Sequence, residues 1–225
     1  RPYSVYLNYQ LSIIHYQLSK MLTQFRQAIA SQDFLITAEV TPPKGGNPQR
    51  MLEVSQGLKG RVHAVNLTDG SRAVLRMSSF AASLILQKNG IEPICQFTCR
   101  DRNIIGLQAD LMGAYALGIG NILALTGDPM KAGDYPKAKA VFDLESVRLL
   151  QLIEKLNSGF DHNQKPLPDE ALDLFAGAAV DPQSPSWSGL QQRFERKLTA
   201  GAQFFQSQLI TDFERFDKFM NQVAV

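Results

Sequence analysis

The sequence is poor in the residues that build metal centres and disulfide frameworks. Cys95 and Cys99 are the only cysteines among 225 residues, and their spacing matches no zinc or redox motif. The three histidines have no partner at the spacing of metal ligands. We therefore interpret both cysteines as free thiols of a reducing compartment, and we expect no metal centre.

Long apolar runs and a strong net charge are also absent. No run reaches the roughly 18 residues that a membrane span needs, and no signal-peptide cleavage pattern follows the short apolar segment 11–14. The 23 basic and 21 acidic residues nearly cancel, without a basic run that would follow a nucleic-acid backbone. The sequence thus predicts a cytoplasmic protein with no membrane or nucleic-acid partner, and it leaves a homo-oligomer open.

What the sequence does contain is an alternation of short apolar strands and helical stretches. Apolar residues at three- and four-residue steps predict a helix over about 10–30, within an N-terminal helical extension of residues 1–30. The predicted strands are 34–40, 62–67, 93–97, 121–125, 174–180 and 203–208. The predicted helices are 49–58, 77–88, 105–117, 144–156, 190–200 and 213–222.

Most of these strands are apolar on both faces, which is typical of a parallel sheet covered by helices on both sides. An eight-unit barrel needs about 250 residues, and this chain ends after about six units. Residues 31–225 are therefore expected to form either an open six-stranded sheet or a TIM-type (β/α)8 barrel truncated after about six units. The barrel is favoured because no Gly-x-Gly-x-x-Gly follows the first strand.

Polar residues stand at the end of each predicted strand. Glu39, Thr68, Asp128 and Gln208 are far apart in the sequence, but a barrel brings all carboxyl ends of its strands to the face that carries active sites. We expect these four side chains to converge. Some strand-end residues, such as Asp101 and Asp181, could instead cap the following helices. The pattern alone indicates a barrel enzyme or a ligand-binding barrel.

Several motifs, in order, resemble those of the flavin-dependent methylenetetrahydrofolate reductases. The resemblance runs from about residue 34 to the end of the chain. It rests on residues 36–45 (ITAEVTPPKG), 90–103 (GIEPICQFTCRDRN), 124–129 (ALTGDP), 196–202 (RKLTAGA) and 205–208 (FQSQ) with Asp212. It implies a β/α barrel that binds FAD, takes hydride from NADH or NADPH, and reduces 5,10-methylenetetrahydrofolate to 5-methyltetrahydrofolate in a ping-pong cycle through flavin N5.

The resemblance also assigns roles to single residues. Glu39 matches the general acid, Asp128 matches a catalytic carboxylate near the flavin and the folate, and Gln208 matches a folate-binding glutamine. Flavin contacts are implied for the remaining matched positions. These positions are Thr68, Gln96, Thr126, Gly127, Arg196 and Lys197. For Arg196 and Lys197 the alternative is that they belong to an ordinary exposed helix face.

The chain departs from the family pattern both at single residues and in the number of strands. Gln96 stands where many members have histidine, and Thr126 stands where some have arginine. The last two strands of the family barrel have no counterpart, which allows a sequence that continues beyond Val225, a partner that completes the barrel, or a degenerate copy. Besides the reductase, a non-catalytic or partner-completed flavin- or folate-binding subunit therefore stays open. A different flavin barrel oxidoreductase is disfavoured by the 124–128 motif.

Overall fold

Strands and helices alternate along the chain in a computed structural model, which describes residues 23–31, 34–168 and 171–224. The strands are β1 (Thr37–Val40), β2 (Ala64–Leu67), β3 (Pro93–Thr98), β4 (Asn121–Leu125), β5 (Phe175–Val180) and β6 (Phe204–Ser207). The helices are α2 (Gln24–Ala30), α3 (Gln49–Leu58), α4 (Ser79–Lys88), α5 (Ile104–Ala116), α6 (Ser146–Asn157), α7 (Trp187–Thr199) and α8 (Phe213–Gln222), with short 3-10 turns η1 (Ser71–Ala73) and η2 (Met130–Ala132). The part of the predicted first helix before residue 23 lies outside the described residues.

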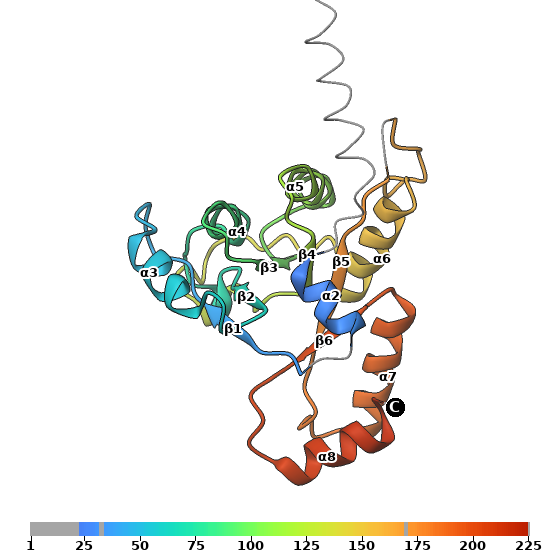
Figure 1. The fold of residues 1–225 in the computed structure, drawn as a ribbon. Helices are drawn as coiled ribbons and strands as arrows, with labels where there is room; N and C mark the ends of the chain where they lie inside the picture. Colours follow the sequence, from blue (N-terminus) through green and yellow to red (C-terminus); the bar gives the residue numbers. More distant parts are fainter. Residues whose placement is uncertain (1–22, 32–33, 169–170, 225) are drawn as a thin grey trace, which may run out of the picture.

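The six strands form one parallel sheet in the order β1-β2-β3-β4-β5-β6. The sheet curls, and helices α3 to α7 follow its outer side (Figure 1). Sequential parallel order with a helix after each strand is the arrangement of a β/α barrel. In the described part of the chain, β1 and β6 do not pair with each other, so the barrel is open. The predicted α/β class and six-unit barrel are confirmed.

Each strand divides its side chains between the two faces of the curled sheet. In β3, Cys95 and Phe97 belong to the core under the outer helices, whereas Ile94, Gln96 and Thr98 lie on the inner side. All six residues of β3 are buried, as expected for a strand covered on both faces. The strict two-residue period therefore aims polar side chains into the barrel interior while the outer face stays apolar.

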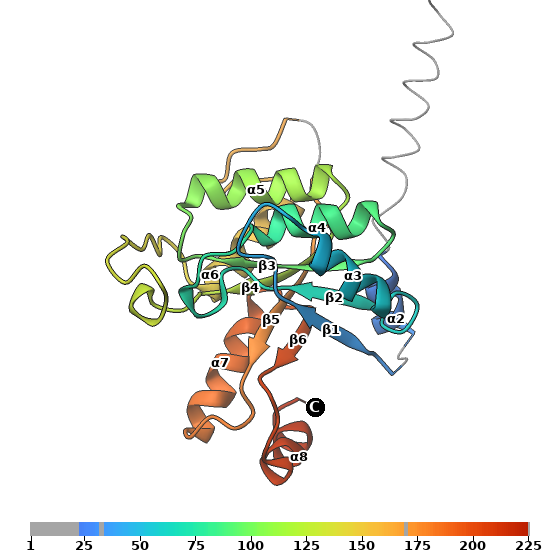
Figure 2. The same cartoon turned by 90° about the vertical axis from the view of Figure 1, so that its left-hand side faces the viewer.

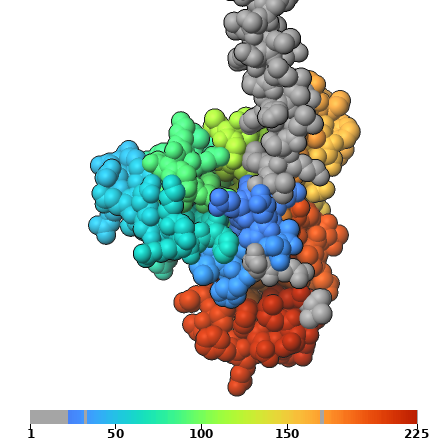
Figure 3. Space-filling view, in the orientation of Figure 1, coloured from blue at the N-terminus to red at the C-terminus, as the bar shows by residue number. Residues whose placement is uncertain are grey.

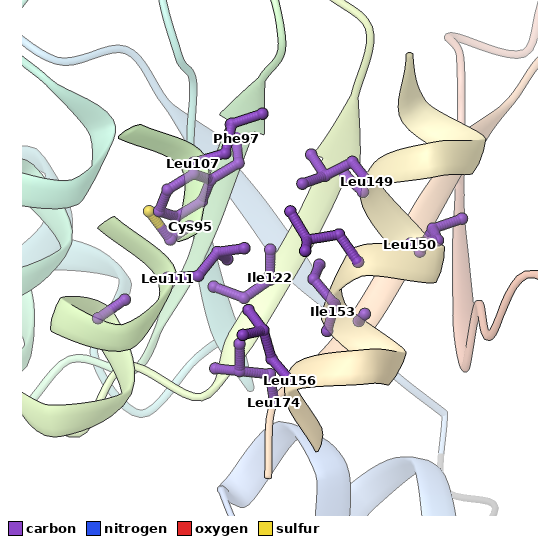
Figure 4. Packing of buried hydrophobic residues seen from close by; sticks show 14 of the residues in the cluster. Cys95, Phe97, Leu107, Leu111, Ile122, Leu149, Leu150, Ile153, Leu156 and Leu174 are labelled. Atoms are coloured by element: carbon purple, nitrogen blue, oxygen red, sulfur yellow. The ribbon is translucent and has the colours of Figure 1, made fainter. Parts of the chain in front are cut away.

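The largest core lies between the outer face of β3, β4 and β5 and the helices α5 and α6. Figure 4 shows Leu107 and Leu111 of α5 reaching toward Ile122 of β4, with Leu149 and Ile153 of α6 on the other side. The two cysteines also lie in this core, each as a free, buried thiol. Burial raises the pKa of each thiol to about 12, so neither is a nucleophile at neutral pH.

Helix α2 closes the amino-terminal end of the barrel. Figure 2 shows it beside the starts of the strands, with the long connection after β4 at the opposite end, and Figure 3 shows it between the β1–α4 half of the molecule and α7–α8. The carboxylate of Glu92 accepts hydrogen bonds from the first helical N–H groups, at 2.7 Å from Gln24 and 2.8 Å from Phe25. The Phe25 ring packs edge-on against Phe175 and Phe204, at centroid distances of 6.1 and 5.0 Å.

Because Phe25 fills the base of the barrel interior and is only 4% exposed, its removal is expected to leave a cavity. We expect Phe25→Ala to lower the free energy of unfolding by about 3–5 kcal/mol, measured by urea denaturation. The matched control is Phe213→Ala, because that ring is 76% exposed and its loss should change stability by less than about 0.5 kcal/mol. Equal destabilisation by the two substitutions would contradict a role for α2 as the closing element.

Candidate functional site

A cavity of about 700 Å³ opens at the carboxyl ends of the strands. Parallel strands deliver their final residues to this one face, so side chains from distant parts of the sequence meet there. Seven of the nine residues that the sequence nominated line it: Glu39, Thr68, Gln96, Thr126, Gly127, Asp128 and Gln208. They come from β1, β2, β3, β4 and the end of β6.

Glu39 is an exposed side chain on the inner side of β1. Its Oε2 accepts a 3.3 Å hydrogen bond from Nε2 of Gln96 on β3. The carboxylate is thereby oriented by an amide donor while it remains open to a ligand. A carboxylic acid in this position can give a proton to a bound substrate.

Asp128 follows β4 and is held by the loop after β2. Its Oδ2 accepts a 2.7 Å hydrogen bond from the backbone N–H of Arg72. The preceding residue, Gly127, has φ +95°, and a Cβ there would lie 3.1 Å from Cβ of Thr98. Only glycine therefore lets the chain turn closely past β3 and present Asp128 to the cavity.

Thr126 is held in place by its side chain, whereas Gln208 is held by its backbone. The hydroxyl of Thr126 accepts a 3.0 Å hydrogen bond from the N–H of Ser146, so it also fixes the start of α6. Gln208 lies just beyond β6 and continues the ladder, because its N–H donates to the carbonyl oxygen of Val180 at 2.9 Å. Its side chain is exposed and lines the cavity.

The two neighbouring basic residues of α7, Arg196 and Lys197, point in different directions. Arg196 points away from the cavity to an exposed ion pair with Glu145, 3.1 Å between Nη2 and Oε1. Lys197 lies inward, and its Nζ donates to the carbonyl oxygen of Ala179 at 2.6 Å, beside a smaller cavity of about 200 Å³ that Gln208 also lines. Burial, followed by the nearby charge of Arg193, lowers the pKa of Lys197. Only the second residue of the pair is placed to meet a ligand in this region.

Asp69 and Arg72 also line the cavity, and the sequence did not nominate either as a ligand contact. Asp69 is largely buried, and its Oδ2 accepts bonds from the Thr98 N–H at 2.9 Å and from Arg102 Nη1 at 2.7 Å. The position of Asp69, directly after Thr68 at a strand end, was the available signal for it. The side chain of Arg72 is placed by a loop conformation that no local sequence pattern indicates.

The structure does not support the alternative that Asp101 and Asp181 cap the following helices. The side chain of Asp101 pairs with Arg100, and Asn103 caps α5. Oδ1 of Asp181 accepts from the N–H of Gln183 in a tight turn before α7, whose cap is a serine. Both aspartates stabilise loops at the carboxyl face rather than helix ends.

Neither a metal-binding cluster nor a membrane-spanning helix is found in the part of the chain that the structure describes. That part has no cluster of three or more His, Cys, Asp or Glu side chains able to hold a metal ion. It also has no helix with the length and apolar character of a membrane span.

An open β/α barrel with carboxylates and an amide converging on its carboxyl face defines the class of barrel enzymes and ligand-binding barrels. Within that class, the family model of methylenetetrahydrofolate reductase matches residues 24–225, and the chain belongs to this family. A relative from Caenorhabditis elegans, named a probable methylenetetrahydrofolate reductase (NADPH), is 26% identical over 215 residues, which are 92% of this chain. The chain spans 30% of the length of that relative.

The cavity has features that suit a flavin. The hydroxyl of Thr68 is buried in the wall and has no hydrogen-bond partner within the described residues, so a ligand heteroatom can supply one. Gly127 lets a ligand approach the backbone, and the volume is within the range of small-molecule sites. The cation of Lys197, in the adjoining smaller cavity, suits the phosphates of a dinucleotide.

Proposed function

We propose that this chain carries the catalytic face of an FAD-dependent oxidoreductase that reduces 5,10-methylenetetrahydrofolate to 5-methyltetrahydrofolate with NADH or NADPH. The observation that carries the proposal is the convergence of Glu39, Asp128 and Gln208 in one cavity, in a chain of this family. When bound, FAD would supply the hydride relay between the nicotinamide and the folate in a ping-pong cycle.

The protein's own residues would bind, orient and protonate the substrate. Glu39, oriented by Gln96, would give the proton that opens the methylene-bridged ring of the folate. Asp128 would stabilise the positive charge that develops on the opened folate, since a fixed carboxylate favours a cation. Gln208 has hydrogen-bond donors and an acceptor on one exposed amide, and it would use them to bind and orient the folate.

The flavin contacts would come from the other cavity residues. Thr68 would use its unpartnered hydroxyl, and Gln96 and Gly127 would contact the ring system from β3 and β4. Thr126 would contribute mainly by position, because its hydroxyl is already bonded to the start of α6. Of the basic pair, Lys197 would bind the phosphates and Arg196 would stay in solvent.

A second candidate is a non-catalytic or partner-completed subunit of the same fold. The observation that favours it is the open sheet: in the described residues β1 pairs only with β2, and β6 pairs only with β5. Unpaired edge strands are places where a further strand can add. Under this proposal, flavin and folate would bind only after a second chain covers these edges, which light scattering with and without ligand would detect.

The experiment that tests the first proposal is purification with added FAD, followed by measurement of flavin absorbance and of folate-dependent NAD(P)H oxidation. Bound flavin together with oxidation that requires methylenetetrahydrofolate supports the reductase. Bound flavin without turnover favours the subunit. The absence of both flavin and turnover in a monomeric, folded sample contradicts the reductase, and the absence of flavin in an oligomeric, folded sample contradicts the subunit as well.

A further inference from the structure

Three loops interlock at the carboxyl end of the strands, where the cavity opens, and we call them the rim loops: residues 41–48 after β1, 70–78 after β2 and 129–140 after β4. Asp134 joins all three, because its carboxylate accepts from Lys44 Nζ at 2.7 Å and from the Leu75 N–H at 3.0 Å. The N–H of Met77 also donates to the carbonyl oxygen of Pro43 at 2.8 Å. The rim loops are therefore one connected layer above the carboxyl ends of the strands.

The backbone of Arg72 is fixed at the inner edge of this layer. Arg72 and Ala73 have φ of 58° and 54°, in the left-handed region that non-glycine residues rarely adopt. The Arg72 N–H is bonded to Asp128, and Gly133 packs on Ala73 so closely that a Cβ there would lie 1.8 Å from the Ala73 carbonyl oxygen. Such a conformation is energetically unfavourable for a non-glycine residue and persists only where the surroundings impose it.

This backbone places the Arg72 side chain in the wall of the cavity, where its charge is free. Within the described residues its guanidinium makes no hydrogen bond and no ion pair, although Asp69 and Asp128 line the same cavity. Asp69 is occupied by Arg102, and Asp128 accepts from the Arg72 backbone instead. A guanidinium presents five donors in a planar fork that matches phosphate and carboxylate oxygens.

The charge of the rim loops points to the same class of ligand. They contain six cationic side chains and one carboxylate, and so carry +5, whereas the whole chain carries +2. The six are Lys44, Arg72, Arg76, Lys131, Lys137 and Lys139. The strand ends below them contribute Glu39, Asp69 and Asp128. These three carboxylates form an anionic floor of the cavity, and of the six cations Arg72 is the one that also lines it.

We propose that Arg72 is an anion-binding residue of this cavity, which grips a phosphate or carboxylate group on the distal part of a ligand while the ligand's reacting part lies on the anionic floor. The proposal rests on the proposed function only in that a nucleotide and a folate both carry such a group. Arg72 anchors and selects the ligand, and takes no part in proton or hydride movement.

The test uses the full chain and two bare anions, pyrophosphate for phosphate and glutarate for carboxylate, with binding measured by titration calorimetry at low salt. Arg72→Gln is the main variant, and Arg72→Lys keeps the charge but removes the fork. Arg76→Gln is the matched control, because it removes an equal charge from the same loop at a side chain outside the cavity. Circular dichroism shows whether each variant is folded.

We expect Arg72→Gln to raise the dissociation constant of one or both anions about 10- to 100-fold, Arg72→Lys to give an intermediate value, and Arg76→Gln to stay within about twofold of the wild type. Loss for pyrophosphate alone identifies a phosphate site, and loss for glutarate alone identifies a carboxylate site. Equal effects of the Arg72 and Arg76 variants, or no anion binding by the wild type, overturn the proposal. If Arg72-dependent anion binding is found in a protein without reductase turnover, the proposed function fails and the anion site stands.

Discussion

Under the proposed function, replacing Glu39 by glutamine is expected to slow folate reduction by about 10²–10⁴-fold, while reduction of the bound flavin by NAD(P)H changes little. Glutamine keeps the size of the side chain and an oxygen that can accept from Nε2 of Gln96, so the local structure should persist. What it loses is the transferable proton. Stopped-flow absorbance of the flavin, recorded separately with each substrate, measures the two half-reactions.

The control for this prediction is Glu53→Gln, a like change on α3 at a side chain that bonds only locally to Gln49. It should leave both half-reactions within about twofold of the wild type, as is usual for surface positions. An equal loss in both half-reactions of the Glu39 variant would show that the carboxylate serves binding or folding, and would remove the general-acid role.

The strand ends were the part of the site that the sequence could predict. Glu39, Thr68, Asp128 and Gln208 converge because a parallel sheet has only one carboxyl edge, and the two-residue period of each strand sets which side chains face inward. The element positions follow from the same apolar patterns. Phe34 is the clearest boundary error, since the predicted first strand begins there but β1 begins at Thr37.

The residues that the sequence missed depend on loop geometry. Arg72 reaches the cavity because two consecutive residues adopt positive φ, and that conformation is imposed by Asp128 and Gly133 from a distant loop, the one that follows β4. Lys197 points inward and Arg196 points to solvent because of the face of α7 that meets the end of β5. Such tertiary contacts leave no local pattern that could be recognised beforehand.

The second large effect is expected for Asp69, a carboxylate that lines the cavity and yet acts on stability. Asp69→Ala should lower the free energy of unfolding by about 3–5 kcal/mol, because it leaves the charge of Arg102 without its buried partner. The side chains of Asp69 and Arg102 are only 9% and 14% exposed. The Thr98 N–H and hydroxyl at the end of β3 would lose their acceptor as well. Urea denaturation with an unchanged m-value measures the loss.

Asp110→Ala is the matched control, because Asp110 is the other carboxylate on the same guanidinium, 2.9 Å from Nε of Arg102. Its side chain is 39% exposed, so solvent screens the pair and the substitution should cost about 1 kcal/mol or less. Similar losses for the two variants would mean that Arg102 is held by either carboxylate alone. A large loss only for Asp69 would show that this carboxylate, although it lines the cavity, serves to hold the end of β2 to β3.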